Sequence, residues 1–164
     1  MLQRSTDNLT TRILVPTGAL GISFESDAFA RGVNSHPNII CVDGGSTDSG
    51  PYYLGTATSK YSRAVTKAEW RQLMLARQRA NVPLVIGTCG TCGTDASVDW
   101  MLDITREICE ELGQKVRVAA LYSSQSVEHV QQALGSGRVT PLEGAPEISA
   151  ETLAQCTNIV ALAG

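Results

Sequence analysis

Short apolar runs rich in β-branched residues alternate with segments of helical periodicity along this chain, and this alternation most constrains its fold. The runs with the composition of buried strands are residues 12–16, 38–42, 82–87, 116–121 and 158–162. The helical segments are residues 26–32, 66–80, the stretch between Asp95 and Gly113, 126–134 and 149–155. This pattern predicts an α/β fold with a mostly parallel sheet and helices on both faces, in a Rossmann-like three-layer arrangement.

Polar residues and glycines mark where the expected helices begin and end. Thr66 followed by Glu69 forms a capping-box pattern, which predicts that one helix begins at Thr66. Gly113 is expected to end the most regular helix, whose apolar residues recur at helical spacing. Ser126 is expected to begin the helix that follows the fourth strand.

The length of 164 residues suits one domain, expected over residues 12–164 after a flexible lead-in at 1–11. The net charge of -3 and the 13 scattered basic residues argue against a nucleic-acid surface, because phosphate binding needs clustered cations. No apolar run reaches the ~18–20 residues of a membrane span, and the polar start lacks a signal peptide's apolar stretch. Five cysteines, an odd number, do not suit a disulfide framework. We therefore expect a cytoplasmic protein.

Three loops rich in Gly, Thr and Ser follow the first three expected strands, at residues 17–23, 43–55 and 88–95. In open parallel sheets, ligands bind beyond the carboxyl ends of the strands. Because all three loops fall at those ends, the sequence predicts that they form one small-molecule site. The residues expected to bind the substrate are Thr17, Gly18, Gly44, Gly45, Ser46, Thr47, Tyr52, Thr88, Gly90, Thr91, Gly93 and Thr94.

Residues 88–95 combine glycines, which let a ligand approach the backbone, with threonine hydroxyls that donate hydrogen bonds. The N–H groups and positive dipole end of the following helix would stabilise an anion there. In that interpretation Asp95 is a candidate catalytic carboxylate. The alternative is a glycine-rich turn in which Asp95 or Thr94 only caps the helix, and the sequence leaves both interpretations open.

The same loop contains Cys89 and Cys92 at Cys-x-x-Cys spacing, which invites a thioredoxin-like redox interpretation. Three residues separate Cys92 from the expected helix, so the thiols lie in the loop and not in the first helical turn. A zinc site would need a second ligand pair, and the remaining cysteines and histidines are not paired in the sequence. No metal site is therefore predicted. A redox pair and a catalytic thiol are left open beside the favoured interpretation, in which both cysteines are small loop residues without chemistry.

Asp43 and Asp48 flank a run of glycines and hydroxyls, and both are candidate acid–base or substrate-orienting groups. The alternative is an Asx-type turn in which the two carboxylates only accept local backbone N–H groups. Tyr52, just beyond, either lines the pocket or anchors the loop. Residues 43–48 are also similar to the first phosphate loop of the actin-like sugar kinase and chaperone ATPase superfamily. That loop joins two strands of a hairpin, an arrangement from which this chain is expected to depart.

Taken together, residues 13–18, 42–55 and 86–95 resemble the acyclic terpene utilisation protein A family, with 43–55 as the specific part. The likeness spans about residues 12–164 and would match the N-terminal portion of these longer proteins. The family carries small residues where Cys89 and Cys92 stand here. The resemblance thus implies that both thiols are dispensable.

The resemblance implies an enzyme or enzyme subunit of carboxylate catabolism, since the family is associated with breakdown of branched, terpene-derived acids as coenzyme A thioesters. Carboxylates and hydroxyls without an evident nucleophilic triad suit hydratase, lyase or isomerase chemistry, with Asp43, Asp48 and Asp95 as catalytic candidates. No cofactor is evident, and an acyl-CoA-type substrate is left open.

Two alternatives remain beside the enzyme. One is a non-catalytic binding or assembly subunit that completes a partner's active site, and the other is a phosphate-loop nucleotide-binding protein. The last expected strand, 158–162, has no following helix to cover it. We therefore expect a homo-oligomer, a partner subunit or a further C-terminal portion.

Overall fold

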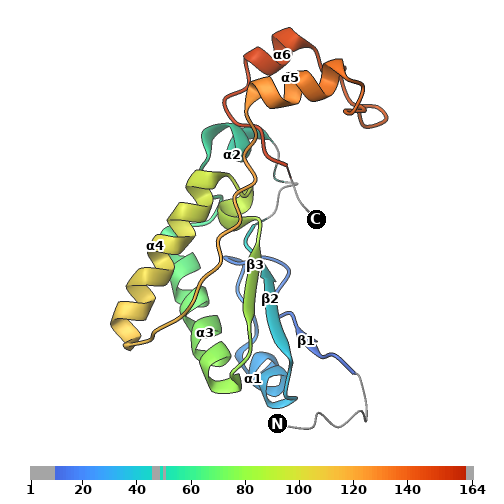
Figure 1. Cartoon of the computed structure of the whole chain (residues 1–164). Helices are drawn as coiled ribbons and strands as arrows, with labels where there is room; N and C mark the ends of the chain where they lie inside the picture. Colours follow the sequence, from blue (N-terminus) through green and yellow to red (C-terminus); the bar gives the residue numbers. More distant parts are fainter. Residues whose placement is uncertain (1–9, 46–48, 50, 162–164) are drawn as a thin grey trace, which may run out of the picture.

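The computed structural model describes residues 10–45, 49 and 51–161, and it has the predicted α/β character (Figure 1). Its elements are β1 (Ile13–Leu14), α1 (Ser26–Asn34), β2 (Ile39–Asp43), α2 (Pro51–Thr56), α3 (Arg63–Ala80), β3 (Leu84–Gly87), the 3-10 turn η2 (Cys89–Thr91), α4 (Asp95–Leu112), α5 (Val127–Gly135) and α6 (Ala150–Ala154). The described strands form one parallel sheet in the order β1-β2-β3.

One face of this sheet carries the hydrophobic core. Ile40 and Val42 are buried, and their register partners on β3 are Leu84 and Ile86, so these four side chains line the same face. The largest buried cluster on this face includes Leu20, Val42, Trp70, Leu73, Met74, Met101, Ile104 and Ile108. Both crossovers move in the same direction across the sheet, and right-handed connections of that kind place their helices on one face.

The opposite face of the sheet is open in the described part of the chain. Ile13 of β1 is 61% exposed, Val15 just beyond it 59%, and Val85 of β3 47%. The sequence predicted helices on both faces, whereas the described helices that pack on the strands cover one. A buried parallel sheet needs both covers, so the structure shows two layers of the predicted arrangement.

Helix α3 begins earlier than predicted. Ser62 is its N-cap, and the Ser62 hydroxyl accepts a hydrogen bond from the Val65 N–H. The capping box expected at Thr66 is wrong, because Thr66 and Glu69 are both buried inside the helix. Glu69 instead accepts hydrogen bonds from the N–H groups of Gly21 (2.6 Å) and Ser23 (2.8 Å), which are 48 and 46 residues away.

The other helix boundaries agree closely with those expected from the sequence. Thr94 caps the start of α4, and Gly113 ends it in the left-handed region at φ 62°. Ser126 and Ser149 cap α5 and α6 through hydroxyl contacts to the backbone. In the described part of the chain, no helix is long and apolar enough to cross a membrane.

Two predicted strands are wrong as far as the described residues go. Residues 116–121 belong to no strand, and most of them are exposed. Of the run predicted at 158–162, the described residues form only an isolated antiparallel bridge, between Val160 and Ser124. Both segments have strand composition, but a strand forms only where a neighbouring edge completes its hydrogen bonds.

Helix α2 lies inside the segment that was expected to be a loop. Pro51 occupies its first position, where a missing N–H is tolerated and φ already suits a helix. The density of turn-forming residues before Pro51 obscured this short helix in the sequence. As a result, Tyr52 and Tyr53 lie on a helix and pack edge to face, with ring centroids 5.3 Å apart.

Helices α5 and α6 form a hairpin whose main contacts are with each other. No residue of α5 is buried, and Leu153 is the buried residue of α6. Figure 1 shows this hairpin beyond the carboxyl ends of the strands, on the far side of α2 from α1 and α3. The hairpin therefore adds little to the core beneath the sheet.

Candidate functional site

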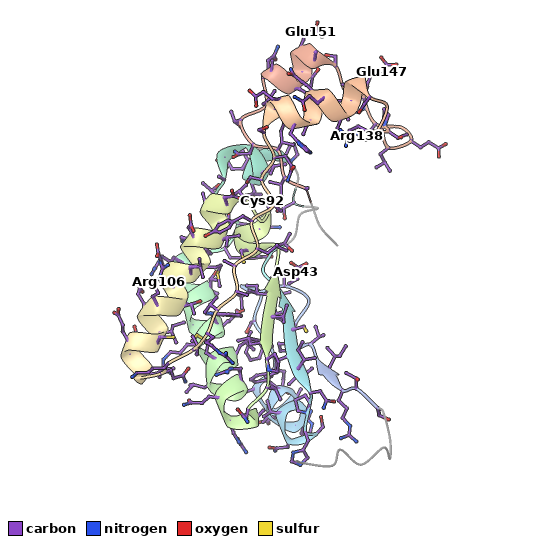
Figure 2. The ribbon with its side chains drawn as sticks, viewed as in Figure 1. Asp43, Cys92, Arg106, Arg138, Glu147 and Glu151 are labelled. Carbon is purple, nitrogen blue, oxygen red and sulfur yellow. The ribbon has the colours of Figure 1, made fainter. Side chains whose placement is uncertain are left out.

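The three glycine-rich loops meet at the carboxyl ends of the strands, as the sequence predicted. The Leu20 N–H donates to the Asp43 carbonyl (2.7 Å), which joins the first loop to the end of β2. The Gly44 N–H donates to the Gly87 carbonyl (2.6 Å), and the Thr91 N–H donates to the Gly44 carbonyl (3.4 Å). Figure 2 shows Asp43 at this end of the sheet, below Cys92.

Gly44 and Gly45 are required by the close contact between two of these loops. A Cβ on Gly45 would lie 2.0 Å from the Thr91 Cα, and a Cβ on Gly44 would lie 2.6 Å from the Gly87 carbonyl oxygen. Neither contact can be relieved without moving backbone. These two glycines, expected to bind substrate, therefore serve first to pack one loop against the other.

The Asp43 carboxylate links the same two loops. Its Oδ1 accepts hydrogen bonds from the Gly45 N–H (3.0 Å) and the Thr88 hydroxyl (2.7 Å). The first contact is the Asx-type turn that the sequence left open as the alternative. The second joins β2's end to the loop after β3. Asp43 is nevertheless exposed, and its Oδ2 accepts no hydrogen bond from the described residues.

The backbone of the loop after β3 is strained. Thr88, Gly90, Thr91 and Gly93 all have positive φ, at 50°, 60°, 84° and 66°. Positive φ suits glycine, but at a β-branched residue it costs about 1–3 kcal/mol and persists only where the surroundings enforce it. Such strain concentrates at binding sites. Here it occurs at two threonines within four residues of each other.

Buried hydroxyls hold this loop in place. Thr91 is completely buried, and its hydroxyl accepts a hydrogen bond from the Lys60 N–H (2.9 Å). Thr94 and Ser97 are also buried, with their hydroxyl oxygens 2.9 Å apart. The Thr91 and Thr94 side chains, expected to bind substrate, thus point into the protein. The hydroxyl of Thr88 is nearer to solvent.

Asp95 pairs with a later segment of the chain. Its N–H donates to the Ser124 hydroxyl (3.2 Å), and its Oδ1 accepts from the Ser124 N–H (3.1 Å). Thr94, and not Asp95, is the N-cap of α4. The first turn of α4 therefore already carries a carboxylate and a hydroxyl of the protein. This charge opposes an anion at that position, so the backbone N–H groups of residues 88–90 are the better place for one, since those of residues 91–93 donate to the Gly44 and Cys89 carbonyls.

The two cysteines of this loop are free thiols, as are Cys41, Cys109 and Cys156. Burial raises the pKa of Cys89 to about 11, so its thiol stays protonated at neutral pH. The Cys92 thiol donates to the Tyr53 carbonyl (3.3 Å), which fastens α2 to the loop. A protonated thiol is a poor nucleophile and redox group, which argues against a catalytic role for Cys89, and the contact of Cys92 is structural.

The remaining predicted residues are at the margin of the site or beyond the described residues. Thr17 is partly buried, and its hydroxyl donates to the Ala19 carbonyl (3.4 Å). A Cβ on Gly18 would meet nothing within 4 Å, and Tyr52 is 68% exposed on α2. Ser46, Thr47 and Asp48 lie outside the described residues, so their predicted roles stay predictions.

Sequence reasoning missed two residues that the loops depend on. Glu69 fastens the first loop to α3 through the Gly21 and Ser23 contacts, and the signal was a carboxylate on the buried face of a helix. Lys60 brings a positive charge to this end of the sheet, where its Nζ donates to the Ser49 hydroxyl (3.2 Å). A single lysine in a polar loop gave no sequence signal.

Two open hollows lie in another part of the described structure. A cavity of about 540 Å³ lies beside Asn81, Val82 and Lys115, and another of about 460 Å³ lies beside Asn34 and His36. Both are at the amino-terminal end of the strands, away from the chemistry-bearing loops.

Comparisons with protein-family models, with curated proteins and with solved structures gave no match. The loop geometry therefore carries the functional argument. The similarity to the phosphate loop of the actin-like superfamily is weakened by that geometry, because the next described element after β2 is helix α2 and not the second strand of a hairpin.

Proposed function

We propose that this chain is an enzyme, or a subunit of one, that acts on a small carboxylate or its acyl thioester by hydratase, lyase or isomerase chemistry. The observation that carries the proposal is the junction at Asp43. There, loops from neighbouring parallel strands meet at the position where α/β sheets bind ligands, and an exposed carboxylate lies between them.

The chemical roles follow from the contacts. Asp43 would take a proton from the substrate or from water and return it in the reverse direction, as a general base and acid. Thr88 would orient the carboxylate through its 2.7 Å hydrogen bond. Lys60 and the N–H groups of residues 88–90 would hold the substrate's anionic end, because the N–H groups of residues 91–93 already donate to the Gly44 and Cys89 carbonyls and alternating backbone conformations create concave sites for anions.

We further propose that the complete assembly has the three-layer arrangement and works in the cytoplasm. Ile13, Val15 and Val85 form an exposed apolar surface on the open face of the sheet, and contiguous surfaces of this kind mark interaction sites. A further part of the protein, a second copy or a partner subunit would supply the missing cover. The likeness to the acyclic terpene utilisation family supports the same expectation.

The exposed area of the chain also favours an assembly. The chain exposes 10969 Å², whereas a folded protein of 17.4 kDa exposes about 7,900 Å². The undescribed residues account for roughly 2,500 Å² at most, the area of unfolded chain of their length. Subtracting both areas leaves an excess of roughly 600 Å², somewhat less than the ~800 Å² that each partner buries in a standard interface. This excess also favours the second candidate, a non-catalytic assembly subunit.

The test is thermal shift and turnover of the full chain with short branched carboxylates and their coenzyme A thioesters. A ligand of this class is expected to raise the melting temperature. Lys60→Met should weaken binding, whereas Asp43→Asn keeps the hydrogen bonds of Oδ1 and should lower turnover about 10²–10⁴-fold. Asp103→Asn is the matched control, because Asp103 lies on α4 and pairs with Arg106 (2.6 Å).

The outcomes separate the two candidates. Turnover by the isolated chain supports the enzyme. Binding without turnover, followed by turnover when a partner is added, supports the assembly subunit. If no acid or thioester changes the melting temperature, or if Asp43→Asn and Asp103→Asn behave alike, the proposed site is wrong.

A further inference from the structure

The segment that follows α4 runs back along the whole length of that helix. We call residues 114–122 the strap. The 18 residues of α4 rise about 27 Å, and the nine residues of the strap can extend about 30 Å, so the strap must be nearly straight to cover this distance. Figure 1 shows it beside α4 and β3, running from the end of α4 towards α5. Its direction is therefore that of β3.

Hydrogen bonds fasten the strap at both ends. At its start, the Gln114 N–H donates to the Cys109 carbonyl (2.9 Å), and the Gln114 amide donates to Gln78 Oε1 (2.6 Å). At its end, the Tyr122 hydroxyl donates to Asp99 Oδ1 (2.7 Å). The Ser124 contacts with Asp95 follow directly.

The middle of the strap has no such contacts. Within the described structure, the backbone groups of residues 115–121 make no hydrogen bond. Val118 is 55% exposed and Leu121 77% exposed. Apolar, β-branched residues of this kind suit a pleated, half-buried strand, and here they face water.

The outer edge of β3 also lacks a partner. The carbonyls of Pro83 and Gly87 accept hydrogen bonds from Ile40 (3.0 Å) and Gly44 (2.6 Å), so residues 83, 85 and 87 direct their backbone groups towards β2. Because strand residues alternate, Leu84 and Ile86 direct their N–H and C=O groups to the opposite edge. No described residue pairs with that edge. An unpaired strand edge of this kind readily accepts another strand.

The topology of the fold also places the strap at the outer edge of β3. The sheet grows in one direction from β1 to β3, and α3 covers the face reached by right-handed crossovers. Helix α4 lies beside α3 in the same layer, where the Trp70 indole donates to the Thr105 hydroxyl (2.9 Å). A right-handed crossover from β3 through α4 therefore returns the chain to the outer edge of β3, parallel to it.

A gap separates the two segments at their amino-terminal ends. The cavity of about 540 Å³ lies between Val82 at the start of β3 and residues 115–117 of the strap. Arg77, Lys115 and Arg117 all line it, and these like charges repel one another across the gap. The strap thus runs parallel to the outer edge of β3 but is separated from it by this gap.

We propose that residues 115–121 close onto β3 as a fourth parallel strand, so that the strap is a movable element of the sheet. Closure pairs the backbone groups of Leu84 and Ile86 and so removes the unpaired edge of β3. It also bears on the loops at the carboxyl end, because the strap leads into Ser123, whose hydroxyl donates to the Gly93 carbonyl (3.4 Å). The proposal holds whether or not these loops bind a carboxylate.

Hydrogen exchange on the unmodified full chain tests the closed state directly. If the strap closes, the Leu84 and Ile86 amides exchange at least about tenfold more slowly than unstructured peptide, as Val85 and Gly87 do. Exchange of Leu84 and Ile86 at the rate of unstructured peptide, with Val85 and Gly87 protected, would overturn the proposal.

A proline scan over residues 117–120 identifies the strap as the partner. Extended backbone accepts proline, but a proline at a paired position removes a ladder hydrogen bond. Closure predicts that every second substitution lowers the melting temperature by about 5–10 °C and exposes Leu84 and Ile86 to exchange, while the others change little. If all four substitutions had the same effect, whether negligible or large, the strap would not pair with β3.

Discussion

The two regions of this chain, residues 10–113 and 114–161, have the same kind of sequence and very different packing. Both alternate strand-like runs with capped helices. Apart from Leu153, every buried hydrophobic side chain of the described chain lies in the first region. The second region exposes Val118, Leu121 and Leu142 at 55%, 77% and 80%.

Local sequence pattern therefore specifies helices more completely than strands in this chain. A helix satisfies its own backbone, so α5 and α6 form with serine caps although they bury little. A strand depends on an edge supplied by another segment. In the first region that edge is present for β1, β2 and β3, whereas residues 116–121 run past an edge without pairing.

The largest expected effect contrasts a core side chain with an exposed one. Ile104 of α4 is fully buried in the hydrophobic cluster beneath the sheet. Ile104→Ala should therefore lower the free energy of unfolding by about 2–5 kcal/mol. Leu121→Ala should change it by about 0.5 kcal/mol or less, because Leu121 is 77% exposed. Denaturant unfolding measures both. Similar losses would mean that the second region is packed after all.

A second contrast concerns buried and exposed glutamates. Glu69→Gln replaces a carboxylate that accepts two backbone N–H groups with an amide that accepts one, and should cost about 1–3 kcal/mol. Glu147→Gln, on the exposed second region, is the control and should be neutral within about 0.5 kcal/mol. Equal stabilities of the two variants would show that the first loop is not fastened to α3.

The first region, residues 10–113, should contribute most to the pH dependence of the melting temperature. Hydrogen bonds from Arg63 and Lys67 lower the pKa of Glu107 from 4.5 to about 2. A lowered folded-state pKa stabilises the protein above pH 4.5, and this contribution is lost as the pH falls towards 2. Glu107→Gln should therefore flatten the decline of the melting temperature over that range. The effect is small and weakens with salt, because the group is exposed. An unchanged profile in the variant would contradict the assignment.

The smallest effect is on thiol reactivity, with the fold left intact. Cys156 is exposed in the second region, whereas burial raises the pKa of Cys89 to about 11. Because the thiolate is the reactive form, alkylation at pH 8 should modify Cys156 well before Cys89. Peptide mass spectrometry follows both sites in one sample. Faster modification of Cys89 than of Cys156 would instead indicate a reactive thiol in the loop.

Much of the first region could be predicted from the sequence, for identifiable reasons. The runs around Ile40 and Val85 are short and β-branched, and Gly113 ends α4 in a conformation that favours glycine. The meeting of the three loops followed from one rule about the carboxyl ends of parallel strands. These features depend on local chemistry or on topology, which the sequence pattern reveals.

The parts that escaped prediction depend on long-range contacts. The partners of Glu69 are 46 and 48 residues away, so its role looked like a local capping box with Thr66. Asp95 pairs with Ser124 across 29 residues, and the inward turn of Thr91 follows from its contact with Lys60. No pattern within a single segment carries such information.

A nuclear magnetic resonance titration of the full chain with a short branched carboxylate and its coenzyme A thioester tests the proposed site directly. We expect the amide shifts to concentrate at Gly44, Gly45 and residues 88–93, where the loops meet at Asp43. The basic cavity beside Arg77 and Lys115 is the internal comparison. Shifts confined to that cavity, or no shifts with either ligand, would contradict a carboxylate site at the carboxyl ends of the strands.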